Sequence, residues 1–288
     1  MPSLRQIRGR LRSIQSTKQI MRAMQLVSAS KLKRAQGRLV QARAVLGFLD
    51  ELLARLLAAT PGLRHPLAQP REGPETLVLV TSDTGLCGSY NTNLIQLAEA
   101  HLARDAARRT DLVFLGKKGF RHFTKRGFRA AAAYLDLAGR TDLARAEAIG
   151  RELMARVLSG KTAAVKLLYS RFHSSTVYRP MLQSWLPITL DAAPAEERAG
   201  PPPVEYIFEP TPQRIFDDLL PRWALATFQL VLLEAFTSEH SARMIAMKNA
   251  TDNAEEILKA LTMQRNKTRQ AAITREISEI VGTAEALK

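Results

Sequence analysis

The C-terminal stretch of the chain is the feature that most constrains its fold. From Pro221 to Lys288 there is no further proline and one glycine, Gly282, among residues that are mostly strong helix formers. This composition predicts a single helix, with a length of about 100 Å at the usual rise per residue. Apolar residues such as Met247, Ala254 and Ile257 recur along it at helical spacing. A helix of that length cannot be buried throughout by its own chain, so we expect it to have a helical partner.

The N-terminal segment supplies such a partner. From Leu4 to Leu56 apolar positions alternate at spacings of three and four, and the exceptions are Lys18, Gln25 and Ser28. A seam sustained for about seven heptads indicates a coiled coil. An ordinary amphipathic helix on a globular core usually ends within about 20 residues. The two terminal helices are therefore expected to pair in antiparallel fashion, with the region between them inserted at one side.

The central region alternates between short apolar runs and helical segments. Proline and glycine mark linkers at 61–74 and 191–203, and Pro221 is expected to end or kink a short helix that starts at Thr211. This alternation indicates an α/β layer domain with a largely parallel sheet. The predicted strands are 77–80, 112–115, 130–135, 164–169 and 176–186, and the predicted helices are 90–108, 117–126 and 142–158. The predicted domains are 1–60, 75–208 and 211–288.

Composition favours a cytoplasmic location. Cys87 is the single cysteine, so no internal disulfide can form and no oxidising compartment is required. The N-terminus lacks the apolar stretch of a signal peptide. The most apolar run, 223–236, is interrupted by Thr227, Gln229 and Glu234, which argues against a membrane-spanning helix. We therefore expect no direct membrane insertion, and any association with a membrane to depend on partners.

Positive charge is concentrated in one segment. The chain carries a formal charge of +15, and residues 1–49 contain eleven Lys or Arg with no Asp or Glu, which accounts for +11 of it. Such a segment requires an acidic partner. Nucleic acid is one candidate, although the segment has a single aromatic residue, Phe48, for stacking on bases, and its seam occupies half of the helix. Acidic protein surfaces are the other candidate.

No motif in the sequence makes a convincing active site. The stretch 159–162 resembles the end of a phosphate-binding loop, but Ala155 stands where that motif needs glycine, and the stretch follows a helix rather than a strand. The loop 83–88 has the right polarity yet lacks a dinucleotide fingerprint, so we interpret it as a tight turn. Cys87 has no nearby histidine, and the histidines lack metal-ligand spacing. We therefore expect the chain not to be an enzyme and to bind no cofactor or metal.

Motifs at both ends and in the middle of the chain resemble one family, the gamma subunit of the F-type ATP synthase. They are Ser3–Arg8, Thr17–Ile20, Ala23-Met24, Ser30–Gln36, Ser82-Asp83 with Gly85–Gly88, Ser238–Ala254, Asn266-Lys267, Arg269–Thr274 and Glu276–Gly282. The resemblance implies a fold of the class α/β plus a long antiparallel α-helical coiled coil, which the N- and C-terminal helices form. A Rossmann-like α/β domain would be inserted between these helices.

The same resemblance implies a non-catalytic rotor. The helices would turn inside a ring of alpha and beta subunits, and the α/β domain would rest with epsilon on the membrane ring of c subunits. ATP, ADP and magnesium would be bound by the partner subunits, and the complex would lie on the cytoplasmic face of the inner membrane. The sequence leaves open whether the transported ion is a proton or sodium. A basic coiled-coil protein that binds nucleic acid remains the alternative.

The resemblance also assigns residues. Met24, Arg269 and Gln270 match positions that contact a beta subunit, while Thr84 replaces a commonly basic residue, which places that ion pair in doubt. Gln25 also replaces a commonly basic residue. The basic shaft, expected to face acidic segments of beta, comprises Arg8, Arg12, Lys18, Arg22, Lys31, Lys33 and Arg34. The apolar tip, expected to turn in an apolar sleeve, comprises Ile277, Ile280, Val281 and Leu287.

Overall fold

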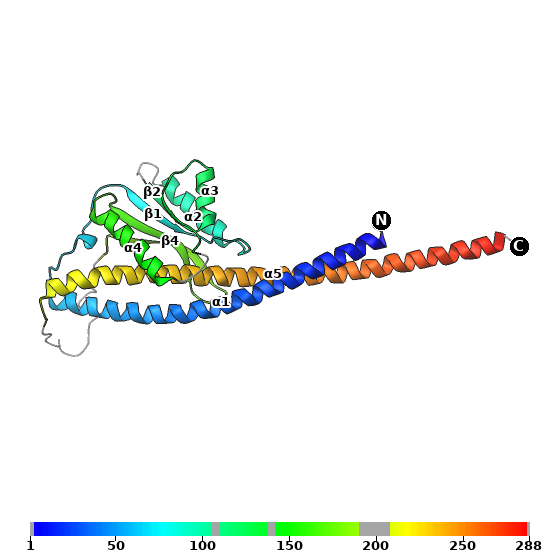
Figure 1. Cartoon of the computed structure of the whole chain (residues 1–288), viewed down its shortest axis with the longest axis horizontal. Coiled ribbons are helices and arrows are strands. Elements are labelled where there is room, and N and C mark those ends of the chain that lie inside the picture. The colour runs from blue at the N-terminus through cyan, green and yellow to red at the C-terminus, as the bar shows by residue number, and fades with distance from the viewer. Residues whose placement is uncertain (1–2, 105–109, 138–141, 190–207, 287–288) are drawn as a thin grey trace. The chain divides into compact units, whose positions relative to one another are not determined.

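The computed structural model describes residues 3–104, 110–137, 142–189 and 208–286 (Figure 1). Three parts of the sequence predictions lie outside these ranges. They are the expected linker 191–203, the tip residue Leu287 and positions 105–108 of the predicted helix 90–108. The chain forms two compact units, one of Met1–Ala29 with Arg243–Lys288 and the other of Ser30–Ala242. These units group segments by contact, whereas the predicted domains follow the chain, so the predicted domain boundaries stay a prediction.

The larger unit contains a five-stranded mixed sheet. Its strands are β1 (Glu75–Val80), β2 (Thr110–Leu115), β3 (Ala130–Tyr134), β4 (Ala164–Phe172) and β5 (Tyr178–Leu186). The spatial order is β3-β2-β1-β4-β5; the first four are parallel, and β5 runs antiparallel to β4. The five strands predicted from apolar runs, and the largely parallel sheet, are confirmed.

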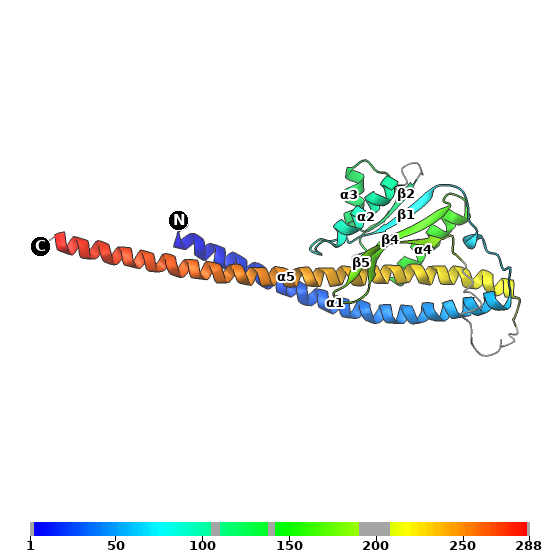
Figure 2. The ribbon, with the colours of Figure 1, turned by 180° about the vertical axis from the view of Figure 1, so that it is seen from behind.

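Helices cover both faces of this sheet. Figures 1 and 2 show α2 (Tyr90–Arg104) and α3 (Lys117–Lys125) on one face, where their apolar residues share a core with Leu77, Leu79 and Phe114. On the other face, α4 (Leu143–Leu158) and residues 212–236 form the larger core with Val78 and Val113. β1 faces both cores, since all six of its residues are buried. A short 3-10 helix, η1 (Pro66–Ala68), lies in the first linker.

The N-terminal helix α1 spans Leu4–Ala59. Every seam position from Leu4 to Leu56 is buried or half-buried, including the polar Lys18, Gln25 and Ser28. The seam was thus correctly identified from its spacing.

The C-terminal helix α5 spans Pro212–Ala286 with Pro221 inside it, so Pro221 does not end a short helix, which was the first of the two expectations for this proline. A proline inside a helix removes one hydrogen bond and costs about 3 kcal/mol. Phe216, Leu220 and Ala224 surround it at helical spacing and are fully buried. Burial of the Phe and Leu side chains stabilises by about 1.5–3 kcal/mol each, which offsets that cost and keeps the helix continuous.

In each unit the segments of α1 and α5 run antiparallel. In the smaller unit Lys18 pairs with Glu255 at 3.0 Å. In the larger unit Arg43 pairs with Glu234 at 2.7 Å, and the indole nitrogen of Trp223 donates to the Asp50 carboxylate.

The helical spacing of Ile257 with Ala254 does not place Ile257 in the core of α5. Ile257 is 48% exposed, and Leu258 instead continues the stripe from Ala254. A four-residue step from Ala254 keeps that stripe on the inner face, whereas a three-residue step rotates Ile257 outward.

One window of α5 is long and apolar enough to cross a membrane by length and composition, and 56% of it is buried within the protein. Core residues such as Phe228 and Leu232 give the same composition to a buried helix.

Candidate functional site

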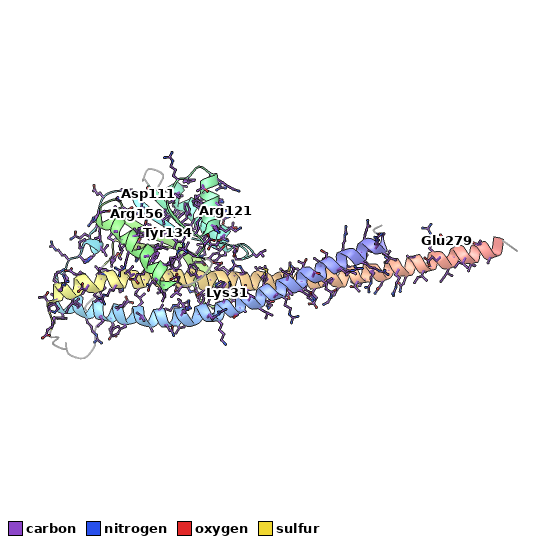
Figure 3. The ribbon with its side chains drawn as sticks, viewed as in Figure 1. Lys31, Asp111, Arg121, Tyr134, Arg156 and Glu279 are labelled. Carbon is purple, nitrogen blue, oxygen red and sulfur yellow. The ribbon has the colours of Figure 1, made fainter. Side chains whose placement is uncertain are left out.

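The basic shaft is a set of solvent-facing cations on α1. Six of its seven members have exposed side chains, and Lys18 is half-buried. Figure 3 shows one of them, Lys31, on α1. The exposed members are Arg8, Arg12, Arg22, Lys31, Lys33 and Arg34. Because their side chains point away from the apolar seam, these cations are available to an acidic partner.

Lys18 differs from the other shaft residues because it is used inside the smaller unit. Its ammonium group both hydrogen-bonds and ion-pairs with Glu255 at 3.0 Å. That hydrogen bond, followed by the Coulomb attraction of Lys18 and Lys259, lowers the pKa of the Glu255 carboxyl. Lys18 therefore helps to hold α1 against α5 within the smaller unit, and its role toward a partner stays a prediction.

A groove in the smaller unit brings two shaft residues together with one that the sequence analysis missed. Arg8 and Arg12 of α1 and Arg265 of α5 line it. The groove has a volume of about 380 Å³, and no carboxylate of the described residues lines it. Arg265 continues the stripe Ala254–Leu258–Thr262 at helical spacing, but this spacing alone does not predict that Arg265 meets Arg8 and Arg12. Three guanidinium groups around one groove favour a carboxylate or phosphate ligand.

The residues assigned to beta contact lie in the smaller unit. Met24 is half-buried, whereas Arg269 and Gln270 are exposed. The described tip residues Ile277, Ile280 and Val281 are 56%, 69% and 57% exposed. Arg275 and Glu279 form an ion pair at 2.9 Å on the same part of α5 (Figure 3). Exposed apolar side chains in this number are the usual mark of an interaction site.

At the carboxyl edge of the sheet, where doubly wound folds bind ligands, internal contacts occupy the N-terminus of α3. The backbone N–H groups at the start of α3 are already used: Lys117 donates to Asp83, Lys118 to the Ser82 carbonyl and Gly119 to the Thr81 hydroxyl, at 2.9–3.0 Å. Gly116 permits this close approach, since its φ is +101° and a Cβ there would lie 2.0 Å from the Thr81 carbonyl oxygen. These N–H groups are therefore not free to bind phosphate.

The stretch 159–162 is the end of a helix rather than a phosphate-binding loop. Gly160, with φ +74°, donates to the Val157 carbonyl, and Lys161 donates to the Arg156 carbonyl. This pair of bonds is the Schellman arrangement, which terminates α4. The hydroxyl of Thr162 is buried, 2.5 Å from that of Thr76. The rejection of a nucleotide site here rests on this geometry.

Cys87 and the histidines show no arrangement for catalysis. Cys87 is buried, and the Asn91 amide donates to its sulfur at 3.1 Å. His101 lies buried against Glu75 at 2.7 Å, and Lys166 holds the second oxygen of that carboxylate. Within the described ranges no group of three or more His, Cys, Asp or Glu could hold a metal ion.

Polar contacts connect α5 to β4 and to the β4–β5 turn along one stripe of the helix. Arg43 bridges Glu234 and the Phe172 carbonyl, at 2.7 and 3.1 Å. Ser238 donates to the Ser170 carbonyl and Ser241 to the Ser175 carbonyl, at 2.9 and 2.5 Å. Burial raises the pKa of Tyr169 above its usual range, and the nearby Glu234 carboxylate adds to the effect. We call the bonds made by Arg43, Ser238 and Ser241 the helix–sheet contacts.

Comparison with known proteins covers nearly the whole chain. The family model described as ATP synthase matches residues 3–287. The ATP synthase gamma chain of Symbiobacterium thermophilum is 42% identical, over 98% of this chain and 97% of that protein. The gamma chain of Moorella thermoacetica is 42% identical over the full length of both.

A solved structure shows the same fold. A chain of the Euglena gracilis mitochondrial ATP synthase aligns with a TM-score of 0.67 at 19% identity, over 99% of this chain and 94% of that one. The chain described here, which has two long terminal helices and a mixed five-stranded sheet, belongs to the ATP synthase gamma chain family.

Proposed function

We propose that this chain is the non-catalytic central-stalk subunit of an F-type ATP synthase, in which it couples ion flow to ATP synthesis or hydrolysis on beta. The observation that carries the proposal is full-length similarity to gamma chains, with paired helices that present an exposed basic face. The alternative, a basic coiled-coil protein that binds nucleic acid, has no support from these relatives.

The terminal helices form an antiparallel coiled coil, and the sheet is Rossmann-like. The first proposal is supported by the buried α1 seam and by the antiparallel ion pairs Lys18–Glu255 and Arg43–Glu234. The second is supported by the parallel strand order β3-β2-β1-β4.

Three surfaces divide the work of the rotor. The exposed members of the basic shaft face acidic segments of beta, where several separate charges bias the conformation of beta without fixing one state. Met24, Arg269 and Gln270 contact a beta subunit. The apolar tip, Ile277, Ile280 and Val281 together with Leu287, turns in an apolar sleeve, because apolar contacts lack directional hydrogen bonds that would resist rotation.

The partners are the alpha and beta subunits, epsilon and the membrane ring of c subunits. A chain with this fold occurs in the solved structure of the central stalk and c-ring of the Tetrahymena thermophila mitochondrial ATP synthase. The chain binds no cofactor itself, and nucleotide and magnesium stay on the partner subunits. The complex lies on the cytoplasmic face of the inner membrane, and this chain does not insert into the bilayer.

Affinity purification tests the assembly. The tagged chain is recovered from detergent-solubilised native membranes after nuclease treatment, and ATPase activity is measured on the eluate. We expect two larger subunits with ATPase activity, and no activity from the tagged chain alone. Recovery from the soluble fraction without those subunits, with binding lost to nuclease or salt, would favour nucleic acid as the partner.

Substitution tests the assigned contact. Arg269→Glu with Gln270→Ala should lower the coupled ATPase rate of the assembled complex. The double substitution removes the proposed hydrogen bonds to beta and reverses the charge at position 269. Arg275→Glu is the matched control, since Arg275 lies on the same helix and is 81% exposed. Equal rates for the double variant and the control would refute the role given to Arg269 and Gln270.

A further inference from the structure

The C-terminal end of α3 carries three exposed cations. Arg121 and Lys125 share one face of the helix at a four-residue spacing, and Figure 3 shows Arg121 on α3. Arg129 is the last residue before β3 and is exposed as well. Because β1 to β4 run parallel, the residue before β3 lies at the amino edge of the sheet, opposite the edge that the loop 83–88 occupies.

The carboxylate closest to these cations in the fold is already used. Glu99 is the one carboxylate that α2 and α3 contain, and it pairs with both His122 and Arg126. No ion pair joins the three cations to another residue of the described ranges. Their positive charge is therefore available to an anion outside the chain.

An aromatic side chain directly precedes Arg129. The N–H of Phe128 donates to the Phe123 carbonyl, and that of Gly127, with φ +84°, donates to the Thr124 carbonyl, both at 3.1 Å. These bonds form a Schellman motif that ends α3 and fixes the turn. The rings of Phe128 and Phe123 pack edge to face with centroids 5.4 Å apart, yet 43% of Phe128 remains exposed. The amino-edge patch is defined as Arg121, Lys125, Phe128 and Arg129.

The composition of the amino-edge patch distinguishes between classes of partner. A stable protein interface has an apolar core from which charged side chains are depleted, whereas this patch offers one partly exposed ring and three charges of one sign. Binding of single-stranded nucleic acid relies on successive aromatic platforms, and the single ring here is already packed against Phe123. An anionic lipid surface needs neither feature, because headgroup phosphates attract separate cations and an aromatic ring is favoured at the membrane–water interface.

We propose that the amino-edge patch binds the anionic headgroup layer of a membrane, with its three cations on lipid phosphates and the Phe128 ring among the headgroups. This contact is peripheral. It rests on the proposed function, in which partner subunits bring the chain to a membrane, and it adds a direct contact at that surface. Headgroups diffuse within the layer and have no fixed register, so the contact can persist while the subunit turns.

Co-sedimentation of the full-length chain with vesicles tests the patch. The vesicles consist of phosphatidylcholine alone or of phosphatidylcholine mixed with phosphatidylglycerol, and the assay gives the partition coefficient. Arg121→Glu with Lys125→Glu is the patch variant. Lys31→Glu with Arg34→Glu is the matched control, because it makes the same change in net charge at exposed cations of α1. Phe128→Ser removes the ring and leaves the charge unchanged.

The patch variant should bind vesicles that contain phosphatidylglycerol at least about 25-fold more weakly, since each cation near an anionic surface contributes about fivefold. Phe128→Ser should weaken binding about fivefold, because the ring would then no longer leave water on binding. The matched control should keep most of the binding of the unaltered chain. Melting temperatures of all variants should agree within about 2 °C, since the substituted side chains are exposed.

Fluorescence tests where the ring lies. Phe128→Trp should shift its emission to the blue when vesicles with phosphatidylglycerol are added, because the indole would enter a less polar layer. Phe48→Trp is the control: Phe48 is 60% exposed on α1 and should show no such shift. A shift of equal size at both positions would contradict the placement of Phe128.

Unaltered vesicle binding by the patch variant, or an equally large loss in the matched control, overturns the lipid contact. Either result leaves the proposed function intact, because assembly with the partner subunits is measured separately by affinity purification. Loss of vesicle binding in the patch variant alone, together with no partner subunits in the purification, would support the lipid contact and refute the proposed function.

Discussion

Replacement of Arg43 by methionine should destabilise the larger unit more than replacement of its partner Glu234 by glutamine. The two side chains meet at 2.7 Å, but the Glu234 side chain is 5% exposed and that of Arg43 is 44% exposed. Loss of one member of a buried ion pair typically costs about 3–5 kcal/mol, because the other charge remains buried without compensation. Water can reach the Arg43 side of this pair, so we expect a loss of about 2–3 kcal/mol for Arg43→Met.

Glu234→Gln should be milder. The half-exposed guanidinium keeps its hydrogen bond to the Phe172 carbonyl and can be hydrated, so a loss of about 1 kcal/mol is expected. The double variant Arg43→Met with Glu234→Leu removes both charges and should fall within about 1 kcal/mol of the unaltered protein.

Urea unfolding followed by circular dichroism measures these free energies of unfolding, and equal m values confirm that the variants expose similar surface. A smaller loss for Arg43→Met than for Glu234→Gln would refute the reasoning. The reasoning would also be refuted if the double variant lost more stability than the two single variants lose together. Desolvation of Glu234 would then not be the dominant effect.

Three further predictions follow from the described contacts. The Glu255 carboxyl, whose pKa is lowered by Lys18, adds stability that is present above its unfolded pKa of about 4.5 and is lost as the pH falls through the lower folded value; an NMR titration should show that pKa rise in Lys18→Met. Gly116→Ala should destabilise by at least about 2 kcal/mol, since its Cβ would meet the Thr81 backbone, and a melting temperature equal to that of the unaltered chain would contradict this. Gly9→Ala, in an open position of α1, should stabilise by about 0.5–1 kcal/mol in the same measurement.

Elements defined by local pattern could be predicted from the sequence. The five strands follow short apolar runs, and the α1 seam follows its spacing without a slip because each signal lies within a few neighbouring residues. Pro221 was misjudged because its local effect on a helix is strong, while the burial of Phe216, Leu220 and Ala224 that overrides it depends on strands distant in the chain.

The candidate site was less accessible to such reasoning. Arg265 joins Arg8 and Arg12 only through the register between two helices, which residue spacing within one helix does not set. The left-handed backbone of Leu86, with φ +63°, was equally hidden, since leucine gives no signal for a left-handed residue. The position of 159–162 after a helix and before a strand could be read from the sequence, and the structure shows the stretch at the end of α4.

The helix–sheet contacts have a mechanical consequence for a rotor. Glu234, Ser238 and Ser241 occupy one stripe of α5, and each is tied to the backbone of β4 or its turn, Glu234 through Arg43. Twisting of this helical segment about its own axis would have to break all of these contacts together, whereas apolar packing alone would allow it to slip by one side chain at a time. The helix–sheet contacts therefore make the packing of α5 on β4 stiff against torsion. Torque applied to this segment of α5 is transmitted to the sheet with little elastic loss.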